Sequence, residues 1–100
     1  MSLDLNTVIV TTSPYTMNKH STVFLVNRSA PSSIILPSLP NDDDGKSFYI
    51  KDASGTSTSN PITITAPGSK TINGVAFAML NGAYSHIQVI YDGTNWLTIA

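Results

Sequence analysis

Short apolar segments alternate with glycine-bearing turns through the second half of this chain, from Lys51 to Trp96. In the segment 62–65, isoleucine and threonine alternate, which is typical of a strand with one buried face. The pairs Asn73-Gly74 and Asp92-Gly93 favour tight turns, because glycine and asparagine adopt positive φ at little cost. The pattern therefore predicts strands joined by tight turns, and no catalytic motif interrupts it.

Segments with the character of strands continue along the whole chain. They are 7–12, 22–27, 33–36, 46–52, 62–66, 75–80, 86–91 and 96–99. Glutamate is absent, and β-branched residues are frequent, so we expect almost no helix. Short strands at this spacing predict an all-β fold, a compact antiparallel β-sandwich or β-roll, formed by a single domain over 1–100.

Charge and composition exclude several classes of function. The net charge is −1 and the basic residues are scattered, so we predict no nucleic-acid binding. No apolar segment approaches the roughly 20 residues of a membrane span, and the first residues lack a signal-peptide pattern, so we predict neither membrane insertion nor export by such a signal. Without cysteine the chain has no disulfide framework and no thiolate site.

Two predicted strands are apolar on both faces, namely 23–26 and 33–36. Such a strand needs a second covering layer, which in a domain of this size a neighbouring chain can supply. Only 11% of the residues are charged, against about 25% in typical domains. A small monomer normally keeps more surface charge for solubility. We therefore expect an obligate oligomer, with a homotrimer as the leading hypothesis.

Several motifs occur in a fixed order. They are Phe48-Tyr49-Ile50-Lys51-Asp52-Ala53-x-Gly55, Asn60-Pro61-Ile62-Thr63-Ile64, Ile72-Asn73-Gly74, Tyr84-Ser85-x-Ile87 and Asp92-Gly93-Thr94-Asn95-Trp96. Together they resemble the C-terminal region of phage tail fibres and tailspikes, and fibre-like proteins of large double-stranded DNA viruses, best over 45–100. The resemblance implies a trimeric all-β structural or attachment protein of the virion that contacts other virion proteins, and it implies no catalytic centre. Fibres usually carry a long shaft before such a head and this chain has none, so a fragment and a small complete protein both fit.

Candidate ligand-binding residues lie in the predicted loops. They are Tyr15, Asn18, His20, Asp42, Asp43, Asp44 and Tyr84. Loops on rigid β-scaffolds commonly carry recognition, and we expect the loops 13–21, 37–45 and 53–60 to gather at one end. There they would bind a host-surface glycan or protein, with threefold symmetry adding avidity.

Metal binding and aromatic recognition each have a simpler alternative. The acidic run 42–44 lacks the alternating spacing of a calcium loop, so we favour a solvated loop. His86, or less readily His20, could complete a three-histidine site in a trimer, but exposed histidines are the simpler interpretation. We predict no metal and no cofactor. Tyr84 and Tyr15 are expected to be exposed, as a sugar platform requires, and Trp96 to be buried.

Catalysis is not expected. There is no Gly-x-Ser-x-Gly elbow, and Asp52 and Asp92 have the positions of strand-end turn residues rather than of a glycosidase pair. We therefore predict a protein without enzymatic activity. Two alternatives stay open beside attachment: a capsid or virion assembly protein with no host ligand, and a polysaccharide depolymerase.

Overall fold

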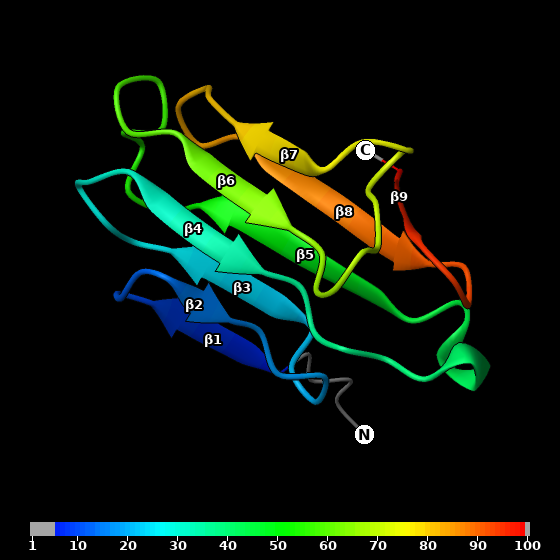
Figure 1. The fold of residues 1–100 in the computed structure, drawn as a ribbon. Helices are drawn as coiled ribbons and strands as arrows, with labels where there is room; N and C mark the ends of the chain where they lie inside the picture. Colours follow the sequence, from blue (N-terminus) through cyan, green and yellow to red (C-terminus); the bar gives the residue numbers. More distant parts are fainter. Residues whose placement is uncertain (1–5, 100) are drawn as a thin grey trace.

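Residues 6–99 are described by the computed structural model, and they form two β-sheets and one short 3-10 helix (Figure 1). The elements are β1 (Thr7–Val10), β2 (Tyr15–Thr16), β3 (Val23–Val26), β4 (Ser32–Ile35), η1 (Asn41–Asp43), β5 (Ser47–Asp52), β6 (Ile62–Thr65), β7 (Phe77–Leu80), β8 (His86–Tyr91) and β9 (Trp96–Thr98). Every predicted segment overlaps a strand, and only the two-residue strand β2 was missed. The all-β fold is confirmed for this part of the chain.

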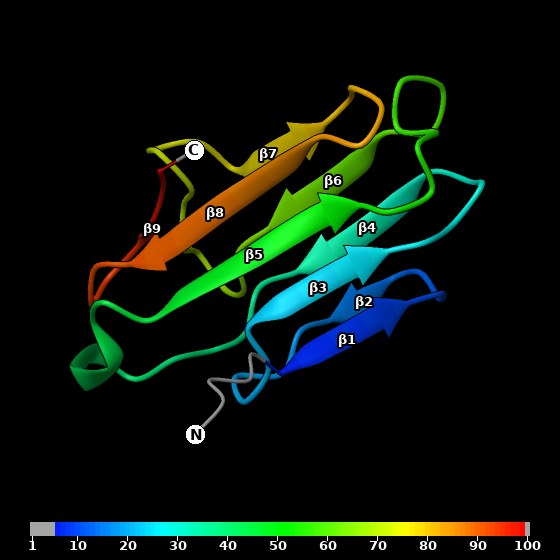
Figure 2. The ribbon, with the colours of Figure 1, turned by 180° about the vertical axis from the view of Figure 1, so that it is seen from behind.

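The chain alternates between the two sheets from β1 to β6. The five-stranded sheet has the order β1-β3-β5-β8-β9, and the four-stranded sheet has the order β2-β4-β6-β7. In Figure 1 the four-stranded sheet lies in front of the five-stranded one, and Figure 2 shows the pair from behind. Each connection from β1 to β6 therefore carries the chain from one layer to the other.

The predicted antiparallel arrangement is wrong for the first half of the fold. β1, β3 and β5 pair in parallel, as do β2, β4 and β6. Antiparallel pairing is confined to β5–β8, β6–β7 and β8–β9. The reason is the alternation itself, because a chain that visits the other sheet before returning enters its next strand from the same end. Both sheets are therefore mixed.

The core lies between the sheets, where alternate residues of each strand are buried. Its largest members include Phe24, Phe48 and Trp96, each at most 1% exposed. Their rings form a continuous series, with centroids 6.4 Å apart for Phe24 and Phe48 and 5.8 Å apart for Phe48 and Trp96. Tyr91 extends the series, 5.1 Å from Trp96. The burial predicted for Trp96 is confirmed.

Successive connections lie at opposite ends of the strands. Residues 11–14, 27–31, 53–61 and 81–85 lie at one end, called here the Asp52 end, and 17–22, 36–46, 66–76 and 92–95 lie at the other (Figure 1). The predicted loops 37–45 and 53–60 are separated by the whole length of β5, and 13–21 contains β2 and spans both ends. The expectation that these loops share one end is therefore wrong, because the parallel winding alternates the ends.

Candidate functional site

A buried carboxylate organises the loops at the Asp52 end. Asp52 closes β5 and is fully buried. Its Oδ1 accepts hydrogen bonds from the backbone N–H of Ser54 at 3.1 Å and of Gly55 at 3.0 Å, and from the Ser54 hydroxyl at 2.7 Å. Its Oδ2 accepts from the backbone N–H of Ser57 at 3.0 Å and of Tyr84 at 3.1 Å. One side chain thereby joins the loop 53–61 to the loop 81–85.

The same contacts keep Asp52 ionised. Burial alone would raise the pKa of this carboxyl group, but hydrogen bonds from Ser54, Ser57 and Tyr84 lower the pKa well below its usual range. Both carboxylate oxygens are occupied by donors of the protein itself, so the group has no free lone pair directed at a substrate. The chemistry of Asp52 is therefore that of a structural anchor, not of a general acid or base.

Tyr84 is exposed and yet held in one place, which is the combination that a recognition residue needs. Its side chain is 59% exposed, as predicted, and its backbone has a φ of +58°. Lys51 Nζ donates a hydrogen bond to the Tyr84 carbonyl oxygen at 2.6 Å and lies 5.9 Å from the ring centroid. Gly55 lies against the ring so closely that a Cβ there would be 2.5 Å from it.

Alanine at position 55 should reveal this contact. Gly55 and Gly68 both have positive φ, +76° and +63°, but only Gly55 has neighbours within 4 Å of an added Cβ. Gly68→Ala should therefore cost only the backbone strain, about 1 kcal/mol of unfolding free energy. Gly55→Ala should cost somewhat more, about 1–2 kcal/mol, because the outer end of the exposed Tyr84 side chain must also turn aside to admit the added Cβ. Denaturant unfolding measures both, and Tyr84→Ala in the Gly55→Ala background should remove the excess; an unchanged excess would contradict the contact.

The remaining predicted residues do not converge on Tyr84. Tyr15 is half-buried, with its ring 6.2 Å from that of Phe24, so the expectation that Tyr15 is exposed is wrong. Its position on the short strand β2, which the sequence pattern did not reveal, directs it toward the core. Asn18 Oδ1 accepts the backbone N–H groups of His20 and Ser21, both at 2.8 Å, and thus closes a local turn.

The acidic residues lie at the end opposite to Tyr84. Asp42 and Asp43 belong to η1 and Asp44 follows it. This segment is fixed beside the β8–β9 turn, because Gly45 N–H donates to the Tyr91 carbonyl oxygen at 2.7 Å. Within residues 6–99, no cluster of three or more histidine and acidic side chains has the geometry to hold a metal ion. The run of acids is thus a surface feature of one connection.

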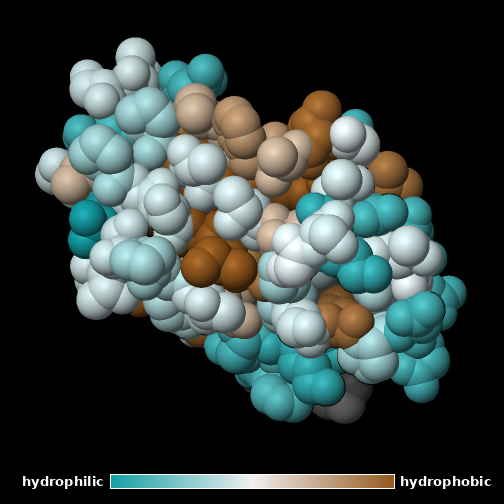
Figure 3. Space-filling model, viewed as in Figure 1, coloured by the Kyte–Doolittle hydropathy of each residue, from teal (hydrophilic) through white to brown (hydrophobic). Residues whose placement is uncertain are grey.

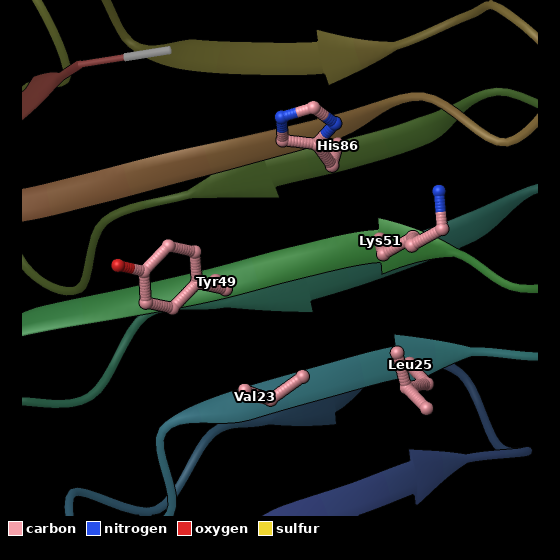
Figure 4. Close-up of a pocket in the computed structure, with 5 residues that line it drawn as sticks. All are labelled: Val23, Leu25, Tyr49, Lys51 and His86. Carbon is pink, nitrogen blue, oxygen red and sulfur yellow. The ribbon is translucent and has the colours of Figure 1, made fainter. Parts of the chain in front are cut away.

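One surface with exposed apolar side chains is not among the sites predicted from the sequence. It is the outer face of the five-stranded sheet, which points away from the four-stranded sheet. A hollow of about 260 Å³ lies on it, between side chains of β3, β5 and β8 (Figure 4). The lining residues are Val23, Leu25, Tyr49, Lys51 and His86. The sequence signal for this surface is the predicted strand 23–26, which is apolar on both of its faces.

The outer face of the four-stranded sheet is different in character. Viewed from outside, it shows hydrophilic and neutral side chains with apolar ones in separate patches (Figure 3). Its exposed apolar residues include Phe77 and Met79 on the edge strand β7, 49% and 42% exposed. Thr63 and Thr65 on the neighbouring β6 alternate with the buried Ile62 and Ile64. The two faces of the molecule are therefore not equivalent.

Comparison with known proteins assigns no relationship. The chain matches no protein-family model, and it matches no curated protein. Among residues 6–99, no helix has the length and apolar character that crossing a membrane requires.

Proposed function

We propose that this protein is a structural and attachment module of a virion, a homotrimer that binds a host-surface glycan or protein. The observation that carries the proposal is the Asp52 end, where a buried carboxylate fixes two loops and an exposed Tyr84. Recognition by loops on a rigid β-scaffold fits this arrangement. The ordered motifs that resemble those of viral fibres support the same role.

The arrangement of the sheets supports a β-roll in preference to a β-sandwich. Strands β1 to β6 alternate between the two layers, so that each turn of the chain adds one parallel strand to each sheet. The antiparallel strands β7, β8 and β9 then close one side of both sheets. Such a winding places connections at both ends of a stiff body. One end is thereby available for a ligand and the other for attachment to a virion.

Trimer formation is supported by the scarcity of charge and by the apolar outer face. A single weak loop–ligand contact would be multiplied when three copies present the same end to a surface. We propose no catalytic step at the Asp52 end, because both carboxylate oxygens of Asp52 accept hydrogen bonds from the protein itself. The alternative is a capsid or virion assembly protein with no host ligand, and the outer face of the five-stranded sheet is the observation that favours it.

Glycan binding by the wild-type protein and by Tyr84→Ala tests the attachment role. On an array of neutral and acidic oligosaccharides we expect binding that Tyr84→Ala reduces at least about tenfold, as loss of an aromatic platform would. His20→Ala, which changes an exposed residue at the opposite end, is the matched control and should bind like the wild type. No binding on the array, together with tight binding to a purified capsid protein, would favour the assembly role instead.

A further inference from the structure

Two asparagine–glycine pairs lie in connections between strands, and their surroundings differ. They are Asn73-Gly74, in the connection between β6 and β7, and Asn81-Gly82, at the start of the connection between β7 and β8 (Figure 2). Both asparagines are exposed. In such a pair the backbone nitrogen of the glycine can attack the side-chain amide of the asparagine, because glycine has no Cβ to obstruct the approach. The two pairs thus offer the same chemistry in two different settings.

Asn73 is held by its side chain and by the turn around it. Its Nδ2 donates to the Thr98 hydroxyl at 2.7 Å, and its Oδ1 accepts the Thr98 backbone N–H at 3.0 Å. The turn is closed by backbone hydrogen bonds in both directions between Ile72 and Val75, at 2.8 and 3.1 Å. Bringing the Asn73 Cγ to the Gly74 nitrogen would break both bonds to Thr98. The fold therefore protects this asparagine.

Asn81 lacks these restraints. Among residues 6–99, its side chain makes no hydrogen bond to the protein, and neither its carbonyl oxygen nor the Gly82 N–H takes part in one. The peptide group between the two residues can therefore turn, and the side chain can reach the Gly82 nitrogen. Gly82 does not have a positive φ, and a Cβ there would lie 3.8 Å from the Ser85 Cβ, an ordinary contact. The backbone thus does not require glycine at position 82, in contrast to Gly74 with its φ of +78°.

The reaction at Asn81 needs only water as a co-reactant. The Gly82 nitrogen loses its proton to solvent and forms a bond to Asn81 Cγ, the Cγ–Nδ2 bond breaks, and Nδ2 takes up a proton and leaves as ammonia. The product is a five-membered succinimide ring. Water then adds to one of the two ring carbonyl carbons and opens the ring to aspartate or isoaspartate. Asparagine and water are thereby converted to an acidic residue and ammonia, and no group is oxidised or reduced.

We propose that Asn81 is a site of spontaneous deamidation in the folded protein, whereas Asn73 is protected from it. The inference goes beyond the proposed function, because it holds for an attachment protein and for an assembly protein alike. Either product adds one carboxylate and changes the net charge of the chain from −1 to −2. Isoaspartate also lengthens the main chain by one carbon.

The modification acts on the Asp52 end of the molecule. The Gly82 carbonyl oxygen accepts hydrogen bonds from the Ser57 hydroxyl and from the Ser85 N–H, the latter at 3.0 Å. An extra main-chain carbon immediately before Gly82 displaces this oxygen from its two donors. The loop 81–85, which carries Tyr84, should therefore loosen as the protein ages.

Incubation of the folded protein at mildly alkaline pH, followed by peptide mapping, tests the inference. Digestion with pepsin in acid stops further deamidation, and mass spectrometry with fragmentation locates each altered asparagine. We expect Asn81 to be lost at least about tenfold faster than Asn73, since two hydrogen bonds of ordinary net strength must first break at Asn73. Both aspartate and isoaspartate should form at position 81. In the isolated isoaspartate form, the Tyr84 and Ser85 amides should exchange hydrogen faster than in the fresh protein.

Two variants and the denatured chain are the controls. Gly82→Ala should remain folded, which circular dichroism checks, and its Cβ should slow the loss of Asn81 to the rate of Asn73 or below. Thr98→Val removes the hydroxyl acceptor and should speed the loss of Asn73 about threefold or more, with Asn81 unchanged. In urea the two asparagines should be lost at nearly equal rates, since each precedes glycine and the protecting bonds are gone.

The outcomes decide each part of the inference. Equal rates at Asn73 and Asn81 in the folded protein, or no loss of Asn81, refute it. A preference for Asn81 that persists in urea refutes protection by the fold. Aspartate without isoaspartate, or an unchanged rate in Gly82→Ala, refutes attack by the Gly82 nitrogen. Unchanged hydrogen exchange in the isoaspartate form refutes the loosening of the loop.

Discussion

Asp52→Asn is expected to remove about 3 kcal/mol or more of unfolding free energy, because a buried anion loses its charge while its donors remain. The five hydrogen bonds to Asp52 come from N–H and O–H groups of Ser54, Gly55, Ser57 and Tyr84. An asparagine keeps one acceptor oxygen and turns an NH₂ group toward the other donors. The total unfolding free energy of a domain of this size is only about 5–15 kcal/mol. The loss should therefore appear as a much lower midpoint of denaturation.

The matched control is Asp92→Asn. Asp92 also accepts backbone N–H groups at the start of a loop, from Thr94 at 2.8 Å and Asn95 at 2.7 Å, and its pKa is also lowered. It differs from Asp52 in being exposed, so water can replace the lost contacts and the loss of stability should be much smaller. Equal losses for the two variants would show that burial of Asp52 contributes nothing.

The pH dependence of stability should identify the same group. Because the pKa of Asp52 is lower in the folded protein than in the unfolded chain, its contribution is present above the unfolded value of about 3.9. The contribution is lost as the pH falls from about 5 toward the folded pKa. Unfolding free energy should therefore fall in acid for the wild type and fall less steeply for Asp52→Asn. Parallel curves would exclude Asp52 as the titrating group.

The local elements of this fold could be predicted from the sequence, whereas their pairing could not. The alternation in 62–65 and the Asp92-Gly93 turn predict β6 and the β8–β9 hairpin correctly, because side-chain period and turn chemistry are local properties. Parallel pairing in β1, β3 and β5 depends on contacts between residues that are distant in the sequence. The same alternation is compatible with either direction of a neighbouring strand, so pattern alone favoured the commoner antiparallel arrangement.

The sequence predicts features of single residues in the candidate site, but not the contacts that bring these residues together. Tyr84 was correctly expected to be exposed, and Asp52 was recognised as a residue at the end of a strand. What links them is a hydrogen bond across 32 positions of the chain, which no local pattern encodes. The three loops were predicted to lie at one end of the fold. Their distribution over both ends follows from the parallel pairing of the strands, which the sequence pattern does not reveal. The outer face of β3 was detected as excess apolar character, without an indication of the hollow.

Phe24→Ala is expected to cost about 3–5 kcal/mol of unfolding free energy, close to the total stability of a marginal domain. Phe24 is 0% exposed, lies at the centre of β3, and packs between the rings of Tyr15 and Phe48. Truncation would leave a cavity between the two sheets that the flanking strands, fixed by parallel ladders on both sides, cannot easily close.

Phe77→Ala makes the same chemical change on the surface and is the matched control. Phe77 lies on β7, the edge strand of the other sheet, and is 49% exposed, so its truncation should cost about 1 kcal/mol or less. Urea unfolding followed by tryptophan fluorescence measures both, since Trp96 lies in the same series of rings as Phe24. A loss for Phe24→Ala no larger than that for Phe77→Ala would mean that the packing between the two sheets does not determine the stability of this fold.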